Sequence, residues 1–217
     1  MSGTEDPHLA RWNQRFSAED YVFGTAPNAF LAAHAPLLRP GMKALAVADG
    51  EGRNGVFLAE RGLDVLAVDF SPVALAKAQR LAAARGVRMR TERADLATWD
   101  WGGPRFDLVA AIFIQFAGPE LRPLLFRRLR EVLVPGGLLI LQGYRPEQIG
   151  HGTGGPSSPE NLYTEAMLRE AFAGMEILEL AAEDRVIEEG AGHRGLSALI
   201  GMVARAPGAR YPGQGSE

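Results

Sequence analysis

The stretch Leu45-Ala-Val-Ala-Asp-Gly-Glu-Gly-Arg-Asn-Gly55 runs an apolar, strand-like segment directly into closely spaced glycines. Glycine has no side chain, so the backbone of such a turn can approach a ligand closely, and the first turn of a following helix offers free N–H groups to an anionic group. Gly50, Gly52 and Gly55 also satisfy the G-x-G-x-x-G pattern. The turn therefore predicts an adenosine-bearing cofactor. By itself it leaves open whether this is a dinucleotide or S-adenosylmethionine.

Composition limits the possible partners. A chain of 217 residues fits one domain, and its formal net charge of −3 gives no general attraction to nucleic acid or to an anionic membrane. There is no cysteine, which excludes disulfides, thiolate metal sites and a cysteine nucleophile. No basic, apolar leader begins the sequence, and no apolar run approaches the roughly 18 residues of a membrane span. We expect a soluble, cytoplasmic protein with a small-molecule substrate, no metal, no nucleic-acid partner and no membrane partner.

Residues 42–141 alternate short apolar runs with segments of helical periodicity, which is typical of βα units around a mostly parallel sheet. Local signals set the boundaries: Gly62 follows one predicted helix as a left-handed cap, and Ser71 with Pro72 begins the next. The pattern predicts strands over residues 43–47, 63–69, 87–92, 106–113 and 138–142, and helices over residues 53–61, 72–85 and 119–133.

The pattern changes after Gln142, where residues 150–159 are rich in Gly, Ser and Pro and predict a loop over a site. The later part of the chain predicts a helix over residues 162–172, strands over 176–186 and 197–205, and a hairpin-like connection over 188–195.

One domain is expected over residues 1–206, followed by a loose tail over residues 207–217. Residues 1–40 are expected to form an N-terminal helical flap. In this flap, three aromatic side chains would pack against the core: Phe16, Phe23 and Phe30.

Two aspartates follow predicted strands. Asp69 lies about 20 residues after the start of the glycine turn, where a carboxylate can accept both hydroxyls of an adenosine ribose. Asp95, with the backbone N–H of Leu96, is placed to contact an adenine ring. The alternatives are that Asp69 only caps the next helix and that Asp95 is an ordinary loop carboxylate.

Several segments, in order and spacing, resemble the motifs of class I S-adenosylmethionine-dependent methyltransferases: Leu45 to Asn54, Val68-Asp-Phe-Ser-Pro72, Ala94-Asp-Leu96, Phe106-Asp-Leu-Val109 and Leu133-Val-Pro-Gly-Gly-Leu-Leu139. The resemblance implies an α/β fold, a three-layer Rossmann-like sandwich whose mostly parallel seven-stranded sheet has an antiparallel last strand. It implies S-adenosylmethionine as the cofactor, with S-adenosylhomocysteine as its product. The implied cofactor-binding residues are Asp49, Gly50, Glu51, Gly52, Arg53, Asn54, Asp69, Phe70, Ser71, Asp95, Leu96 and Phe113.

Within that superfamily, further segments resemble the tellurite-resistance and thiopurine methyltransferase branch: Trp12-Asn-Gln-Arg-Phe16, Tyr21 to Asn28, Gly52-Arg-Asn54, Thr153-Gly-Gly-Pro156 and Leu162-Tyr163. The resemblance covers residues 11–206. It implies a chalcogen oxyanion or a thiol as the methyl acceptor.

The first strand departs from the family pattern. The family usually has an acid and, two residues later, a glycine where this chain has Ala46 and Ala48. We expect Asp49 to replace the acid by binding the amino group of the cofactor's methionine portion. Arg53 or Asn54 is then placed to reach its carboxylate.

Methyl transfer from a sulfonium needs alignment of the acceptor and exclusion of water more than covalent catalysis. Acceptor contacts are expected from the N-terminal flap and from loops at the carboxyl ends of strands. The candidates are Tyr21, Gln115, Tyr144, Arg145, His193 and Arg194. A histidine such as His151 or His193 is otherwise an ordinary surface residue, and the arginines are otherwise solvated or ion-paired.

Two other functions are weighed against a methyltransferase. A dehydrogenase of this size is expected to carry Tyr-x-x-x-Lys, which none of the four tyrosines begins. A non-catalytic module that binds S-adenosylmethionine remains open, although it would not need both a flap and a covering loop.

Overall fold

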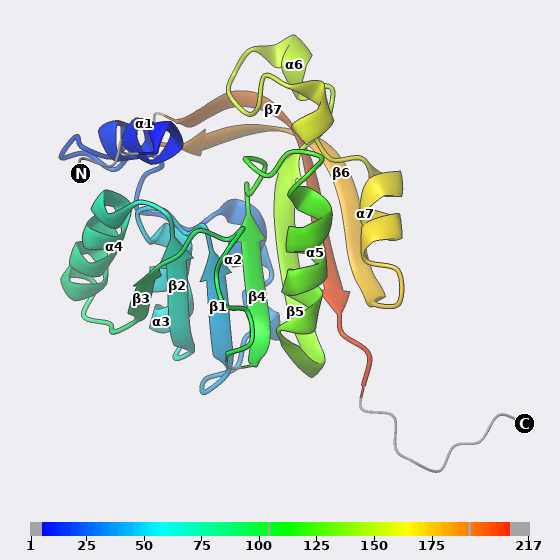
Figure 1. The fold of residues 1–217 in the computed structure, drawn as a ribbon, viewed down its shortest axis with the longest axis horizontal. Coiled ribbons are helices and arrows are strands. Elements are labelled where there is room, and N and C mark those ends of the chain that lie inside the picture. Colours follow the sequence, from blue (N-terminus) through cyan, green and yellow to red (C-terminus); the bar gives the residue numbers. More distant parts are fainter. Residues whose placement is uncertain (1–5, 104, 191, 209–217) are drawn as a thin grey trace, which may run out of the picture.

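The computed structural model describes residues 6–103, 105–190 and 192–208. Within them, seven strands form one sheet in the order β3-β2-β1-β4-β5-β7-β6 (Figure 1). Neighbouring strands pair in parallel except at β7, which is antiparallel to both β5 and β6. The strands are β1 (Lys43–Val47), β2 (Asp64–Asp69), β3 (Arg90–Arg93), β4 (Phe106–Ile112), β5 (Leu133–Tyr144), β6 (Glu176–Glu189) and β7 (His193–Arg205). The predicted mostly parallel sheet with an antiparallel last strand is confirmed.

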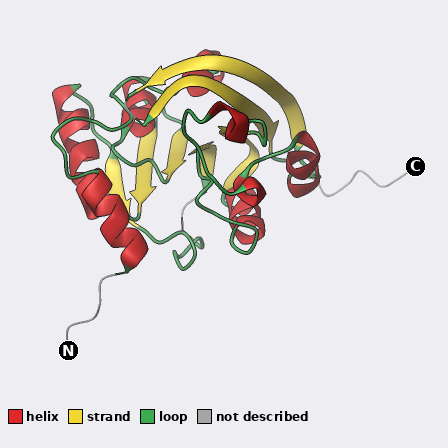
Figure 2. Cartoon of the chain, turned by 90° about the horizontal axis from the view of Figure 1, so that it is seen from above, coloured by secondary structure: helices red, strands yellow, loops and turns green. Residues whose placement is uncertain are grey.

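Helices cover both faces of the sheet (Figure 2). On one face, Leu58 of α3 packs in a cluster with Leu108 and Ile140 of the central strands. On the other face, Leu125 of α5 packs with Val109. The helical segments are α1 (Pro7–Arg15), α2 (Ala29–Ala33), η1 (Ala35–Leu37), α3 (Arg53–Glu60), α4 (Pro72–Ala84), α5 (Arg122–Glu131), α6 (Gln148–His151), η2 (Pro159–Asn161) and α7 (Glu165–Ala171).

Local signals explain the boundaries around the first two strands. Gly62 adopts a φ of +81° after α3, which is the left-handed conformation that a glycine cap provides. Ser71 caps α4 by accepting a hydrogen bond at its Oγ from the backbone N–H of Ala74, 3.2 Å away, and Pro72 is the first helical residue. Both predicted caps are confirmed.

The predicted boundary between the helix over residues 119–133 and the strand over residues 138–142 is wrong. Helix α5 ends at Glu131, and Leu133 already pairs with Phe106 as part of β5. Residues 134–137 then form an irregular stretch within the strand, before pairing resumes between Leu138 and Leu108. The Pro-Gly-Gly segment therefore lies inside β5 as a bulge and does not separate a helix from a strand.

Other boundaries also differ from the prediction. Strand β3 begins at Arg90 and not at Val87. The connection predicted over residues 188–195 is too long, because β6 and β7 continue to pair as far as Glu189 and His193. The ends of β6 and β7 at the hairpin extend beyond the sheet core, so they lack the apolar alternation that marks a half-buried strand. The predicted tail lies mostly outside the described residues, since the structure describes only residues 207 and 208 of it.

The β6–β7 hairpin arches over the carboxyl ends of the parallel strands and reaches the N-terminal segment near α1 (Figure 1). There the N–H of Gly192 donates to the carbonyl oxygen of Val22 at 2.9 Å. Phe16 and Phe30 of the N-terminal segment are buried, while Phe23 is half-buried. No helix in the described part of the chain is long and apolar enough to cross a membrane.

Candidate functional site

The glycine turn between β1 and α3 requires left-handed backbone at several positions. Gly50 and Gly52 have φ values of +57° and +90°, and Gly52 is the N-cap of α3. A Cβ atom on Gly52 would lie 2.5 Å from the Cβ atom of Ala78, so no other residue fits there. Ala48 also has a positive φ, +49°, which explains why a glycine is expected at this position.

Asp49 faces the first turn of α3. Its two carboxylate oxygens accept the N–H of Gly55 at 3.0 and 3.2 Å, which satisfies one of the free donors of the helix start. Burial raises the pKa of Asp49 to about 7; the charge of Asp69 acts in the same direction, and the Gly55 hydrogen bond opposes it. That Asp49 binds a cofactor amino group stays a prediction.

Asp69 connects the glycine turn to the start of α4. One carboxylate oxygen accepts the N–H of Gly50 at 2.8 Å, and the other accepts the N–H of Ser71 at 2.8 Å. Burial raises the pKa of Asp69, against these two hydrogen bonds. Since Ser71 caps α4 with its own hydroxyl, the carboxylate of Asp69 mainly holds the geometry of the turn. A carboxylate has about four lone-pair sites, so Asp69 keeps acceptor capacity beyond these bonds.

Glu51 is directed away from solvent into a buried ion pair with Lys77 of α4. Its Oε1 lies 2.5 Å from the Lys77 Nζ, and its Oε2 accepts the N–H of Phe23 at 3.3 Å. The Lys77 Nζ also donates to the carbonyl oxygens of Ala18 and Asp20. This ion pair and these hydrogen bonds therefore connect the glycine turn to the N-terminal segment.

Arg53 and Asn54, the first two residues of α3, already have partners. The Arg53 Nη2 lies 2.6 Å from Oε2 of Glu189 in the hairpin, and the Asn54 Oδ1 accepts the N–H of Asn28 at 2.9 Å. The other terminal nitrogen of Arg53, Nη1, is buried and has no hydrogen-bond partner. This nitrogen is a free donor next to the glycine turn.

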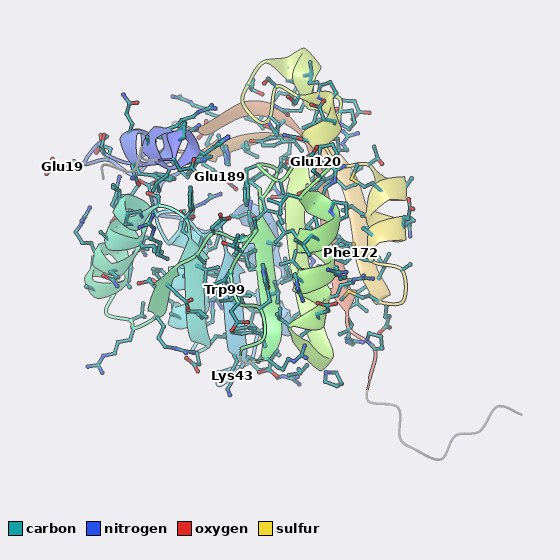
Figure 3. The ribbon with its side chains drawn as sticks, in the orientation of Figure 1. Glu19, Lys43, Trp99, Glu120, Phe172 and Glu189 are labelled. Carbon is teal, nitrogen blue, oxygen red and sulfur yellow. The ribbon has the colours of Figure 1, made fainter. Side chains whose placement is uncertain are left out.

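Asn28 and Glu189, neither of which was predicted as a site residue, link the flap, the sheet and the hairpin. The side-chain nitrogen of Asn28, Nδ2, donates to Gln142 Oε1 at 2.7 Å and to Glu189 Oε1 at 3.1 Å. Figure 3 shows Glu189 at the carboxyl ends of the strands, at the opposite end of the sheet from Lys43. Burial alone would raise the pKa of Glu189, but contacts with His193, Arg53 and Ala29 lower it to about 2.

His193 is surrounded by aromatic rings. The ring centroids of Phe113 and Phe23 lie 4.4 and 4.5 Å from that of His193, and the ring of Tyr144 lies at 5.8 Å. Burial lowers the pKa of His193, partly opposed by Glu189, so the imidazole is neutral at pH 7. The structure thus brings together the predicted residues Phe113, Tyr144 and His193. Phe113 has a φ of +55°, a strained conformation of the kind that gathers at functional sites.

Gln115 and Tyr144 are joined through the backbone. The side-chain nitrogen of Gln115 donates to the carbonyl oxygens of Tyr144 and Asn161, and its oxygen accepts the N–H of Tyr144 at 2.6 Å. Gln115 therefore organises the end of β5 with all of its donors used. The hydroxyl of Tyr144 is buried without a partner, and burial raises its pKa.

The remaining candidates lie around this centre. Tyr21 donates through its hydroxyl to the carbonyl oxygen of Lys77 at 3.1 Å. Arg145 pairs with Asp184 and, at 3.3 Å, with Glu147, so it is ion-paired. Arg194 is exposed.

The end of β3 carries the predicted adenine contacts. Asp95 is exposed and accepts the N–H of Ala97 at 3.0 Å, while Leu96 is buried. Phe70, directly after β2, is half-buried. The roles assigned to these side chains stay predictions.

A groove of about 370 Å³ lies between the N-terminal segment and the hairpin, lined by residues 23–27, 29 and 185–190. A second hollow, of about 490 Å³, lies beside Asp64 at the amino end of β2 and therefore away from these side chains. In the described ranges, no cluster of three His, Asp or Glu residues is arranged to hold a metal ion.

Comparison with known proteins agrees with this geometry. Residues 44–137 match the family model described as a methyltransferase domain. The ribosomal protein L11 methyltransferase of Thermus thermophilus is 37% identical over 153 residues, which are 70% of this chain and 53% of that protein. The chain spans about half the length of the curated relatives that it matches.

Two solved structures show the same fold. TehB from Haemophilus influenzae superposes with a TM-score of 0.68 at 18% identity, over 91% of this chain and 66% of that one. The N-methyltransferase NodS from Bradyrhizobium japonicum, in complex with S-adenosyl-L-homocysteine, gives a TM-score of 0.68 at 13% identity, over 93% and 100% of the two chains. The sheet order and these superpositions show that the chain has the Rossmann-like fold of these proteins, and residues 44–137 resemble a methyltransferase domain.

Proposed function

We propose that this chain is an S-adenosylmethionine-dependent methyltransferase that acts on a small molecule. The observation that carries the proposal is the left-handed glycine turn at the carboxyl end of β1, fixed by Asp69 and followed directly by α3. It lies within the residues that match the methyltransferase domain. The NodS complex with S-adenosyl-L-homocysteine supports the choice of cofactor.

The residues at the turn fit such a cofactor. Gly52 packs the turn closely against Ala78 of α4, and Arg53 keeps one buried donor without a partner. We assign the ribose to Asp69, and the adenine to Asp95 with Leu96, as the resemblance implies. S-adenosylmethionine would supply an activated methyl group on its sulfonium.

The chain's own task is then to position the acceptor and to exclude water. The N-terminal segment and the hairpin meet over the strand ends through Val22 and Gly192. Phe23, Phe113 and Tyr144 surround His193 with apolar surface. A neutral His193 is suited to accept a proton from the acceptor. Desolvation by these rings also strengthens any polar contact that a bound acceptor makes there.

For the acceptor, we propose a chalcogen oxyanion or a thiol, as in the tellurite-resistance and thiopurine branch. The likeness of fold to TehB over 91% of this chain supports that branch. The Thermus relative is named for a ribosomal protein, but this chain spans only 53% of it. A small acceptor also agrees with the groove of about 370 Å³ between the flap and the hairpin. A cytoplasmic location remains a prediction from composition.

Parallel calorimetric titrations with S-adenosylhomocysteine and NAD test the cofactor. We expect binding of S-adenosylhomocysteine only; binding of NAD alone would overturn the proposal. Transfer of labelled methyl from S-adenosylmethionine to tellurite, selenite, small thiols and small phenols then tests the acceptor class. Binding of S-adenosylhomocysteine without transfer to any of them would favour a non-catalytic sensor or assembly module.

A further inference from the structure

Three buried polar atoms without hydrogen-bond partners gather around Glu189. They are Nη1 of Arg53, Oη of Tyr144 and Nδ1 of His193. The side chains of Arg53 and Tyr144 are 6% and 1% exposed. A buried polar atom that loses water without gaining a partner is costly, and natural proteins keep few of them. The three atoms come from α3, β5 and β7, so no single local feature accounts for all of them.

Contacts through Glu189 and His193 connect these three residues. Oε2 of Glu189 lies 2.6 Å from Nη2 of Arg53 and 3.9 Å from Nδ1 of His193. The second distance is too long for a hydrogen bond. The ring centroids of His193 and Tyr144 are 5.8 Å apart, and the charges of Glu189 and Arg53 both act on the Tyr144 hydroxyl.

The unpaired donors favour an anionic oxygen at this position. Glu189 balances the guanidinium of Arg53, and His193 is neutral. A second guanidinium, that of the exposed Arg15, lies over the ring of Phe23, which itself packs against His193. Asp49 is a second carboxyl group on which the Arg53 charge acts, so the hydrogen-bond donors, and not the net charge, point to the ligand. A guanidinium N–H and a tyrosine hydroxyl both donate hydrogen bonds to anionic oxygen.

We propose that Arg53 Nη1 and Tyr144 Oη bind an anionic oxygen, a carboxylate or an oxyanion, of a small molecule that lies beside His193. The proposal deepens the proposed function and rests on it for the source of that oxygen. The oxygen belongs either to the carboxylate of the cofactor's methionine portion or to the methyl acceptor. The two sources share one recognition chemistry, and ligands that carry only one of them separate the two.

Tyr163 provides a matched comparison. Its hydroxyl is also buried without a partner, and its ring packs 5.5 Å from that of Phe126 within the apolar core. The guanidinium that acts on it, that of Arg122, donates through its Nη1 to the carbonyl oxygen of Glu160 at 2.6 Å. Replacing either tyrosine by phenylalanine removes one unpaired hydroxyl and keeps the ring. Only the change at Tyr144 should affect a ligand.

The test compares the unmodified protein with Tyr144→Phe and Tyr163→Phe by calorimetry. The ligands are S-adenosylhomocysteine, 5′-methylthioadenosine, which has no carboxylate, and the anions benzoate and selenite, titrated into free and S-adenosylhomocysteine-loaded protein. If the oxygen is the cofactor's, Tyr144→Phe weakens S-adenosylhomocysteine about tenfold or more and leaves 5′-methylthioadenosine unchanged. If it is the acceptor's, S-adenosylhomocysteine binding is unchanged and anion binding to the loaded protein falls about tenfold or more. Tyr163→Phe alters neither.

Equal affinities of Tyr144→Phe and Tyr163→Phe for every ligand would overturn the proposal. Both variants should also melt at a higher temperature than the unmodified protein without ligand, because each loses an unpaired buried hydroxyl. A lower melting temperature for Tyr144→Phe would mean that its hydroxyl has a partner in the free protein, against the proposal. Failure of the unmodified protein to bind S-adenosylhomocysteine or 5′-methylthioadenosine would overturn the proposed function instead. In that case, the titrations of free protein with benzoate and selenite would still test the proposed anion site, independently of the cofactor.

Discussion

The ammonium group of Lys77 lies 2.5 Å from Oε1 of Glu51, and the two side chains are 1% and 2% exposed. The same ammonium group donates to the carbonyl oxygens of Ala18 and Asp20 at 2.8 and 2.6 Å. One buried cation thus joins the glycine turn, α4 and the N-terminal segment. The same ion pair therefore fixes both the glycine turn and the N-terminal flap.

Replacing Lys77 by methionine should destabilise the protein strongly. The change leaves the Glu51 carboxylate buried without its countercharge and removes the donor to two carbonyl groups. Breaking a buried pair from one side typically costs about 3–5 kcal/mol. Urea unfolding followed by circular dichroism measures the loss. The protein's other lysine, Lys43, is exposed, so Lys43→Met should change stability by no more than about 0.5 kcal/mol.

The double variant Lys77→Met with Glu51→Gln separates charge from packing. Removing the second charge should restore about 1–3 kcal/mol relative to Lys77→Met alone. If the losses in free energy of unfolding that the two substitutions cause simply add, the two side chains do not interact as a charge pair.

The turn offers a second test at Ala48, whose φ of +49° is in the left-handed region. An L-residue with a Cβ atom is strained there by about 1–2 kcal/mol, while glycine is not. Ala48→Gly should therefore raise the free energy of unfolding by about 0.5–1 kcal/mol, after the larger entropy of the unfolded glycine is subtracted. Ala44→Gly, in the regular part of β1, should lower it. A loss of stability in Ala48→Gly would contradict the assigned strain.

Much of the fold could be predicted because its signals are local. Ser71 with Pro72 begins a helix, Gly62 ends one, and the apolar run that starts at Phe106 is a buried strand, as predicted. The prediction failed where tertiary pairing overrode local chemistry. Leu133 belongs to β5 because it pairs with Phe106, and the Pro-Gly-Gly segment after it is accommodated as a bulge.

The candidate site was less readable from the sequence. The glycine turn, Asp69 and His193 were visible as motifs or as reactive residue types. Glu189 was not, because its role depends on a hairpin that carries it to Arg53, 136 positions away in the chain. Contacts of this range leave no periodicity in the sequence.

Asp69 should control recognition of the ribose. If its free lone pairs accept the ribose hydroxyls, Asp69→Ala weakens S-adenosylhomocysteine binding by about 1.5–3 kcal/mol through the loss of hydrogen bonds to a charged group. Asp64, exposed at the other end of β2, provides the control Asp64→Ala, which should leave the affinity unchanged. Calorimetry with S-adenosylhomocysteine and its 2′-deoxy analogue separates ribose binding from support of the turn. The two ligands should bind Asp69→Ala with similar affinity. If the variant instead prefers S-adenosylhomocysteine over the 2′-deoxy analogue as strongly as the unmodified protein does, Asp69 has a purely structural role.

The pH dependence of stability should report Asp49. Its pKa rises from 3.8 to about 7 on folding, so the folded state holds this proton more tightly than the unfolded state. The contribution of this group to stability is therefore complete below about pH 4 and falls as the pH rises to about 7. Each pH unit corresponds to about 1.4 kcal/mol, so the whole interval corresponds to about 4 kcal/mol. Asp49→Asn keeps an oxygen for the Gly55 N–H and does not titrate. Its stability relative to the unmodified protein, from urea unfolding at pH 4.5 to 8, should increase with pH and level off above 7. A constant difference would show that Asp49 does not titrate in this range.

Docking of the N-terminal segment on the sheet depends on a glycine in β7. A Cβ atom on Gly201 would lie 2.4 Å from Cε2 of Phe30, which is buried in α2. Gly201→Ala should therefore force the ring out of its position and cost about 1–3 kcal/mol in the free energy of unfolding, as expected for an overfilled core. Combining it with Phe30→Leu should recover part of this loss, because leucine leaves room for the added methyl group. Gly150→Ala, with no atom within 4 Å of the added carbon, is the control and should be neutral. If Gly201→Ala is as stable as that control, the ring of Phe30 does not pack on β7, and the N-terminal segment closes over the sheet in another way.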